Sequence, residues 1–281
     1  MNYRHAYHAG NAADVVKHAL LCRALLAMTR KDKPFLALDS HAGAGLFDLV
    51  MDERALRGGE WRGGIQKVLE DPAPHPLLDP YLDALDELNA GQPERRFYPG
   101  SPWLLARLTR PGDRVMACEL HPEEIPLLEE ALKPFARARA YHMDGYDALS
   151  AFLPPTSRRG LILVDPPFER KDEYERMVKG LKAGLKRFSS GVWLLWRPIK
   201  TGGADAGFLE ALQEVSAPVL DLRLDFAPPE APGLTGTGMT VVNPPYGFAQ
   251  EAATLLEWLT PRLAVEGFRG RWSGEWLRPE A

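Results

Sequence analysis

The sequence is poor in cysteine and has no long apolar segment, and each absence excludes a class of protein. Its two cysteines, Cys22 and Cys118, fall in a predicted helix and a predicted strand far apart in the chain, so they provide neither a disulfide framework nor a zinc knuckle. We therefore expect no metal site. No apolar run approaches the roughly 20 residues needed to cross a bilayer, and the N-terminal stretch MNYRHAYHAGN lacks the apolar core of a signal peptide. These features predict a cytoplasmic protein without a membrane segment.

Net positive charge is also lacking. The 34 lysines and arginines are outnumbered by 38 aspartates and glutamates, which gives a net charge of −4. This balance argues against wholesale binding of a polyanion but does not exclude a local basic surface. The chain has 281 residues, of which 45% are apolar, and this is enough for the packed core of one large domain. We expect a single domain over residues 1–281.

Residues 159–168, with the sequence RGLILVDPPF, are the stretch around which the rest is organised. Residues 161–164 form a continuous apolar run, typical of a strand buried on both faces of a parallel sheet. Asp165 stands at the carboxyl end of this strand, two prolines then direct the chain out of the sheet, and Phe168 is expected to present an exposed flat ring. The tetrapeptide has the form of the (Asp/Asn)-Pro-Pro-aromatic signature of amino-methyltransferases, whose acid and carbonyl accept hydrogen bonds from an amine while the ring stacks on an extruded base. A buried strand followed by a structural Pro-Pro loop is the alternative interpretation.

A glycine turn, DSHAGAG, follows the first predicted strand at residues 35–38 and contains Gly43 and Gly45. Glycines after a strand let the backbone approach a bound nucleotide, and the N-terminus of a following helix favours an electron-rich group. The dinucleotide fingerprint is incomplete, because Asp48 stands where its third glycine would be and would repel a pyrophosphate. The turn therefore favours a nucleoside cofactor without phosphates over a nicotinamide dinucleotide. A purely structural turn is the alternative.

Acids follow two later strands. The predicted strand at residues 114–118 leads to Glu119, where a nucleotide fold places the carboxylate that binds ribose hydroxyls, about 20 residues after the glycine turn. Here Glu119 lies 80 positions after Asp39 (119 − 39), and a helical insertion at residues 48–98 accounts for the excess. A third strand leads to Asp144, which either meets an adenine amino group or caps a helix.

His18 and Ser101 have structural interpretations from the residues alone. His18 lies in a helix that Asn11 can cap, and a solvated or hydrogen-bonded structural histidine is as good an interpretation as a ligand. Ser101 begins a helix with Pro102 at the first helical position, so capping explains Ser101 completely.

The tetrapeptide at residues 243–246, Asn-Pro-Pro-Tyr, is a second match to the same signature. It follows the seventh predicted strand, whereas Asp165 ends a strand expected beside the first, where the ligand crevice of a doubly wound sheet forms. We therefore assign Asp165 as catalytic and Asn243 as structural. The sixth predicted strand, residues 219–226, alternates apolar and charged residues as an edge strand does.

The densest basic region of the chain lies on both sides of Asp165. Most charge runs are solvated helix faces, but clustering around a candidate catalytic acid favours a rim that contacts phosphates. The members of this region are Arg158, Arg159, Arg170, Lys171, Arg176, Lys179, Lys182, Lys186 and Arg187.

The whole chain resembles the bacterial family that N6-methylates an adenine of 23S ribosomal RNA with S-adenosyl-L-methionine. The resemblance runs from YRHAYHAGNAADVVKH through DSHAGAG, YPGSP, ELHP and RRGLILVDPPF to GMTVVNPPY, and it covers nearly all the residues. It implies an α/β fold, the Rossmann-like core of class I methyltransferases, with a seven-stranded, mostly parallel sheet and a small inserted helical subdomain.

The resemblance also implies roles for individual residues. The family's catalytic acid falls on Asp165. The family's tyrosine that touches RNA falls on Tyr3, and we expect Arg4 beside it to be a further RNA contact. The family's cofactor contacts fall on His18, His41, Ser101, Glu119, Asp144 and Gly145.

The implied mechanism needs neither a metal nor a covalent enzyme intermediate. The adenine leaves its stack at a cost of a few kcal/mol and rests on Phe168, while Asp165 and the Pro166 carbonyl accept hydrogen bonds from N6. Phe168 stands where the family usually has tyrosine. A phenyl ring keeps the stacking plane and loses only the hydroxyl.

Three rival functions remain at this point. A nicotinamide oxidoreductase is disfavoured by the missing third glycine and by the Asp-Pro-Pro-Phe motif. A DNA adenine methyltransferase shares the chemistry, and the catalytic motif does not separate it from an RNA enzyme. A non-catalytic RNA-binding protein is disfavoured by the intact Asp165, glycine turn and Glu119. We expect a monomer that acts on 23S ribosomal RNA.

Overall fold

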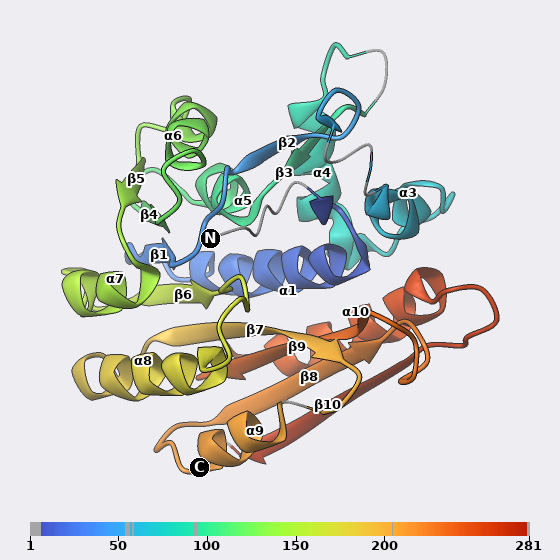
Figure 1. Ribbon diagram of the computed structural model, residues 1–281. Helices are drawn as coiled ribbons and strands as arrows, with labels where there is room; N and C mark the ends of the chain where they lie inside the picture. The colour runs from blue at the N-terminus through green and yellow to red at the C-terminus, as the bar shows by residue number, and fades with distance from the viewer. Residues whose placement is uncertain (1–6, 54–56, 58, 93–94, 204, 280–281) are drawn as a thin grey trace.

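The computed structural model (Figure 1) describes residues 7–53, 57, 59–92, 95–203 and 205–279. Its centre is an eight-stranded sheet with the strand order β10-β8-β9-β7-β6-β1-β4-β5. Five neighbouring strands, from β7 to β5, run parallel, and β9, β8 and β10 continue the sheet with each strand antiparallel to its neighbour. The strands are β1 (Leu36–Asp39), β4 (Arg114–Glu119), β5 (Ala138–His142), β6 (Gly160–Val164), β7 (Val192–Lys200), β8 (Val219–Asp225), β9 (Leu234–Val242) and β10 (Arg271–Arg278).

Helices cover both faces of this sheet, and each face has its own apolar core. The strand β6 is buried along its whole length, as its continuous apolar run predicts for a central parallel strand. One face carries α1 (Ala12–Thr29), α5 (Ser101–Leu108), α6 (Ile125–Leu132) and α10 (Phe248–Leu263). The other face carries α7 (Gly145–Phe152), α8 (Glu173–Arg187) and α9 (Ala206–Gln213).

The residues between β1 and α5 contain a separate two-stranded antiparallel ladder, β2 (Leu46–Asp48) with β3 (Phe97–Pro99). Between these two strands the described residues form short helices: η2 (Glu60–Gly63), α3 (Ile65–Leu69), η3 (Pro76–Leu78) and α4 (Asp79–Leu88). The apolar side of α4 packs into the same core as α1. This segment therefore shares its core with the main sheet rather than forming one of its own.

The fold differs from the sequence prediction at two places. The sheet has eight strands instead of seven, because β10 pairs with β8, so β8 is an internal strand and the prediction that it lies at the edge was wrong. The glycine turn after β1 leads into β2 at Leu46, and the helix expected directly after this turn is absent from the described residues there.

Helix α1 lies inside the molecule, and this placement brings polar residues into the interior. Asn11 caps the helix, since its side chain accepts a hydrogen bond from the Asp14 amide, as predicted. Contacts with α5, α10 and the sheet bury Asp14, Lys17 and His18. In the described part of the chain, no helix has both the length and the apolar character that a bilayer span needs.

Candidate active site

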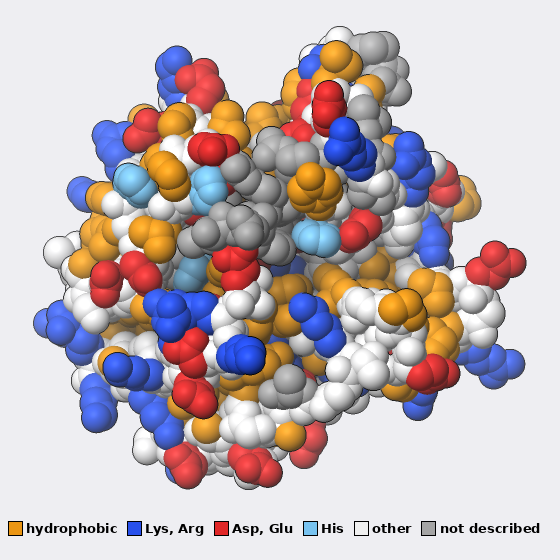
Figure 2. Space-filling view, viewed as in Figure 1, with side chains coloured by type: hydrophobic (Ala, Val, Ile, Leu, Met, Phe, Trp, Pro, Cys, Tyr) orange, Lys and Arg blue, Asp and Glu red, His pale blue; other side chains and the backbone are white. Residues whose placement is uncertain are grey.

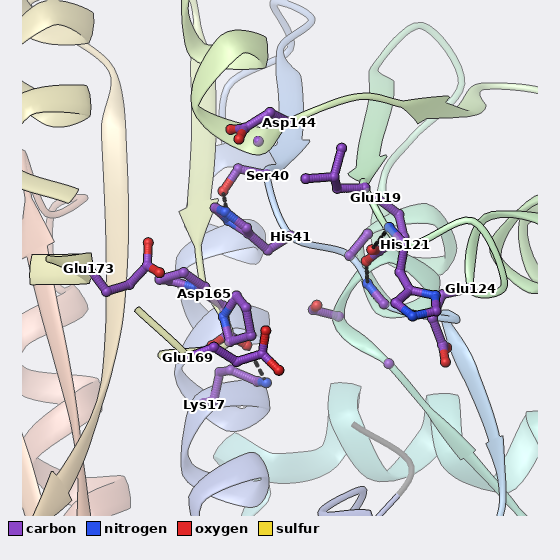
Figure 3. Close-up of a pocket in the computed structure, with 18 of the residues that line it drawn as sticks. Lys17, Ser40, His41, Glu119, His121, Glu124, Asp144, Asp165, Glu169 and Glu173 are labelled. Atoms are coloured by element: carbon purple, nitrogen blue, oxygen red, sulfur yellow. Dashed lines mark hydrogen bonds and ion pairs between the residues drawn. The ribbon is translucent and has the colours of Figure 1, made fainter. Parts of the chain in front are cut away.

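A pocket of about 330 Å³ opens at the carboxyl ends of the parallel strands, next to β1 (Figure 3). The chain passes from β1 to β4 on one side and reaches β6 on the other, so this is the point where the strand order reverses and where open α/β sheets bind their ligands. The volume is in the range of small-molecule sites. The residues that the sequence selected and that line this pocket are His18, His41, Gly43, Ser101, Glu119, Asp144, Gly145, Asp165 and Pro166.

Asp39 and Ser101 are joined at the end of β1. The Ser101 hydroxyl donates a hydrogen bond to the Asp39 carboxylate over 2.7 Å, and the N-cap of α5 is Gly100. The prediction that Ser101 caps this helix was therefore wrong, and its hydroxyl is tied to a buried acid instead. Burial raises the pKa of Asp39 to about 7, although the Ser101 hydrogen bond opposes the shift.

Glu119 is held rigidly at the end of β4. One carboxylate oxygen accepts from the Gly43 amide at 2.8 Å, and the other accepts from the His121 amide at 2.6 Å. Two backbone donors fix the orientation of this carboxylate and link the glycine turn to the loop after β4. Each oxygen has a further lone pair, so the group can still accept hydrogen bonds from a sugar diol.

Asp144 has two partners where β5 leads into α7. One oxygen accepts from the Tyr146 amide at 2.8 Å, which makes Asp144 the N-cap of α7. The other oxygen pairs with Arg176 of α8 at 3.1 Å. Gly145 follows, and a Cβ atom there would lie 2.0 Å from the Ser40 carbonyl oxygen. Only glycine therefore allows α7 to begin so close to the glycine turn.

His41 projects into the pocket from the glycine turn (Figure 3). Its ring meets Tyr146 edge to face, with 5.1 Å between the ring centroids. A hydrogen bond of 2.8 Å joins the Ser40 hydroxyl and His41 Nδ1. Burial lowers the pKa of His41 to about 4, so this imidazole is neutral at pH 7.

His18 is a buried, hydrogen-bonded histidine at the inner wall of the pocket. A hydrogen bond of 2.8 Å joins its Nδ1 to the Tyr98 hydroxyl, which in turn meets the Tyr81 hydroxyl at 2.7 Å. The Tyr98 ring stacks on the imidazole. The structural interpretation from the residues and the role implied by the resemblance are therefore compatible, because the same side chain is packed and faces the pocket.

Asp165 has a counter-ion that the sequence analysis missed. Lys17 of α1 donates to Asp165 Oδ2 at 2.6 Å and contacts Asp14 Oδ1 at 2.8 Å, and the side chains of Lys17 and Asp14 are 4% and 3% exposed. Although burial lowers the pKa of Lys17, the carboxylates of Asp14 and Asp165 raise it well above its usual value. A lysine among the apolar residues of α1 was the signal that could have identified it.

Phe168 does not present the exposed ring that was predicted. It is half-buried and packs edge to face on Tyr174 and Trp196, with ring centroids 5.0 and 5.9 Å away. Its φ of 49° is left-handed, which is unusual for an aromatic residue. Hydrophobic packing beyond the Pro-Pro turn explains why this ring turns inward.

The second tetrapeptide has a different backbone and a structural role. The left-handed residue is its first, Asn243, with φ 53°. The side-chain amide of Asn243 donates hydrogen bonds to the backbone carbonyls of Ser189 and Gly191, so it holds the turn before β7. These contacts lie at the amino end of β7, away from the pocket.

Two predicted groups of RNA contacts have different outcomes. Tyr3 and Arg4 lie outside the described residues. Arg158 and Arg159 precede β6, at the opposite end of that strand from Asp165. Arg159 donates to the Met28 and Lys33 carbonyls and so caps the end of α1. The prediction that these two arginines lie on a rim around Asp165 was wrong, because residues adjacent in sequence are separated by the length of the strand.

The pocket as a whole is negatively charged and suits a cationic ligand. Its lining includes six carboxylates against three cations, Lys17, Arg170 and Arg176. Such a lining would repel the pyrophosphate of a dinucleotide, whereas it favours a nucleoside that carries a sulfonium and an ammonium group. The carboxylates are Glu119, Glu124, Asp144, Asp165, Glu169 and Glu173.

Comparison with known proteins gives one consistent family. The family model described as ribosomal RNA large subunit methyltransferase D, RlmJ, matches residues 32–278. The chain is 38% identical to ribosomal RNA large subunit methyltransferase J of Escherichia coli and 35% identical to that of Haemophilus influenzae, over 100% of both chains in each case. The crystal structure of protein LPL1258 of Legionella pneumophila superposes with a TM-score of 0.88 at 34% identity, covering 96% of this chain and 98% of that one. The protein therefore belongs to the RlmJ family of ribosomal RNA large subunit methyltransferases.

Proposed function

We propose that this chain transfers a methyl group from S-adenosyl-L-methionine to N6 of an adenine in 23S ribosomal RNA. The observation that carries the proposal is the position of Asp165. It lines the same pocket as Gly43, Glu119 and Asp144, and it is anchored by the Lys17 ammonium. The names of the two relatives specify the ribosomal RNA of the large subunit as what they methylate.

The residues around the glycine turn fit the cofactor. In this proposal Glu119 accepts hydrogen bonds from the ribose hydroxyls, and Asp144 accepts one from the adenine amine. His18 and Ser101, whose hydroxyl is bonded to the buried Asp39, line the inner part of the pocket, where the acidic lining suits the cationic end of the cofactor. When bound, S-adenosyl-L-methionine supplies an electrophilic methyl group on a sulfonium.

Asp165 prepares the acceptor amine. Its Oδ2 is engaged by Lys17, and no described residue donates to its Oδ1 within hydrogen-bonding distance. Oδ1 and the Pro166 carbonyl accept from the two N6 hydrogens, which directs the nitrogen lone pair toward the methyl group. The carboxylate also stabilises the positive charge that develops on nitrogen during transfer, and the excess proton then leaves to Asp165 or to water.

In this proposal the partly accessible ring of Phe168, which follows the pocket-lining residues Pro166 and Pro167, is the surface on which the extruded base stacks. Tyr174 and Trp196 hold its ring in place, so stacking costs little further side-chain entropy. The ring contact is sequence-tolerant, because every base has an aromatic face. The two acceptors therefore select a base that carries an exocyclic amine, and the family resemblance favours adenine among such bases.

Residues 1–281 act in this proposal as one catalytic domain, with residues 48–98 as an inserted helical subdomain, in a monomeric cytoplasmic enzyme. A DNA adenine methyltransferase is the second candidate, because Asp165 and Phe168 would serve it equally well. The relatives' names favour RNA.

The test is transfer of a tritiated methyl group to 23S ribosomal RNA that lacks modification, with duplex DNA as the competing substrate. We expect label in RNA, located by nuclease mapping at N6 of one adenine. Label in DNA alone would establish the second candidate instead. Label at a position other than an adenine amine would contradict the role of Asp165.

A further inference from the structure

The mouth of the pocket is a poor place to hold RNA phosphates. Its six carboxylates and three cations give the lining a net negative charge, and all three cations, Lys17, Arg170 and Arg176, are already paired with aspartates. The cationic cofactor benefits from this field, but a polyanion is repelled by it. An RNA whose base enters the pocket therefore needs an anchoring surface nearby.

Helix α8 carries a row of lysines on its solvent face. At 100° per residue, the three lysines of α8, Lys179, Lys182 and Lys186, fall on one face together with Glu175, and Lys171 lies in the loop before the helix. Lys182 pairs with Glu214 at 2.8 Å. Across the described ranges, no acid lies within ion-pair distance of Lys171, Lys179 or Lys186, and all three are exposed. Figure 2 shows lysine and arginine side chains gathered over α8, in the lower left of the view.

The charge of this segment contrasts with that of the rest of the chain. Residues 169–187 contain seven lysines and arginines and four acids, a net charge of +3. Since the whole chain has a net charge of −4, the remainder carries −7. Positive charge is thus concentrated on one helix of an otherwise acidic protein, which is the pattern expected of a local phosphate-binding surface.

The position of α8 connects this surface to the chemistry. The helix begins at Glu173, eight positions after Asp165 (173 − 165), and Arg170 between them lines the pocket. From Glu173 to Lys186 the helix extends about 20 Å at 1.5 Å per residue, the length of a few nucleotides. A groove of about 570 Å³ runs along it toward α9, and its lining includes Tyr174, Phe208, the acid Glu175 and the side chains of the three α8 lysines.

We propose that the lysine face of α8, Lys171, Lys179 and Lys186, binds the phosphates of the RNA strand that flanks the target adenine, with the groove toward α9 accommodating its sugars and bases. The inference rests on the proposed function, since it names the surface that presents RNA to that pocket. The strand leaves the pocket at Arg170 and follows α8 away from the acidic mouth.

The test is RNA affinity and the KM for RNA at several salt concentrations, for the triple variant Lys171→Ala, Lys179→Ala, Lys186→Ala. Each phosphate contact contributes about 0.7 to the salt slope of a single strand, so three contacts correspond to about 2 units. The variant should lose this part of the slope and bind about 100-fold more weakly at 0.1 M salt, with the loss shrinking toward 1 M salt. Cofactor affinity, measured by calorimetry, should equal that of the wild type.

Two further variants make the outcome specific. Lys31→Ala, Lys33→Ala, Arg114→Ala removes the same charge from exposed positions at the amino end of the parallel strands and should leave the slope unchanged. The triple lysine-to-arginine variant on α8 keeps the charge and should bind as the wild type does. Equal losses in the two alanine variants, or an unchanged slope for the α8 variant, would overturn the assignment while wild-type methylation of RNA still supported the proposed function. A wild-type protein that neither binds nor methylates RNA would overturn both.

Discussion

Replacing Lys17 by methionine should destabilise the protein and disable its chemistry together. Methionine keeps most of the side-chain volume but leaves Asp14 and Asp165, which are 3% and 12% exposed, without their shared cation. Breaking a buried ion pair from one side costs about 3 to 5 kcal/mol, because a charge remains buried without compensation. For a domain of this size that corresponds to a drop in Tm on the order of 10 °C.

The assay is thermal unfolding of the wild type and of Lys17→Met across a pH series. The pKa of Lys17 is raised, so its stabilising contribution is complete at pH 7 and would be lost only at strongly alkaline pH. The difference in Tm between the two proteins should narrow as the pH falls, because protonation of the Asp14 and Asp165 carboxylates removes the buried negative charge. Methyl transfer by the variant should also fall, since Asp165 loses its anchor.

Lys31→Met is the matched control, because Lys31 is an exposed lysine just beyond the same helix. It should unfold within about 1 °C of the wild type, as most surface substitutions do. A Lys17→Met protein with wild-type Tm at pH 7 would refute the reasoning, because the ammonium would then not be compensating two buried carboxylates. If the difference in Tm between Lys17→Met and the wild type did not change with pH, only the electrostatic explanation of the destabilisation would be refuted.

Three further predictions concern the pocket. Asp165→Ala should abolish methyl transfer with cofactor affinity kept, and activity within tenfold of wild type would remove it from the mechanism; Asn243→Ala should do far less. Glu119→Ala should weaken binding of S-adenosyl-L-methionine by about 1.5 to 3 kcal/mol in calorimetry, and unchanged affinity would exclude a cofactor contact. Burial raises the pKa of Asp39 to about 7, so between about pH 4 and pH 7 the native state retains a proton that the unfolded chain releases. The free energy of unfolding should therefore fall as the pH rises from about 4 to about 7. Asp39→Asn should remove this part of the pH dependence of Tm, and an unchanged profile would show that Asp39 is ionised throughout.

The sequence was sufficient for the parts of the fold that local chemistry determines. The apolar run before Asp165 is a buried parallel strand, as predicted, because a strand covered on both faces has no polar positions. Glu119 and Asp144 end neighbouring strands, and parallel strands bring their carboxyl ends to one edge. Strand topology therefore placed the acids together without knowledge of any side-chain contact.

The errors came from features that local patterns do not encode. Strand β10 has mostly exposed side chains, so it lacks the apolar alternation by which half-buried strands are recognised. Arg158 and Arg159 were placed near Asp165 because they are close in sequence, yet the five residues of β6 separate them by about 16 Å. Lys17 was missed because both its importance and its burial depend on a partner distant in the chain.

Roles for His18 and Ser101 came from family resemblance, and the structure shows why the residues alone could not supply them. His18 reaches the pocket and also packs against Tyr98, so a structural and a binding histidine look alike in the sequence. Ser101 occupies the position of a typical helix cap, but its partner is Asp39, 62 residues away. The tertiary structure, and not the local sequence, determines which group a hydroxyl bonds to.

The hydrogen bond between Lys17 and Asp165 joins positions 148 residues apart in the chain. Closing so long a loop is entropically costly, so we expect this contact to form only after both α1 and β6 have joined the fold. The two residues of the ion pair come from the beginning and the middle of the polypeptide. A shortened chain that began after α1 would retain the entire Asp-Pro-Pro-Phe loop and would still lack the ammonium that holds its acid in place.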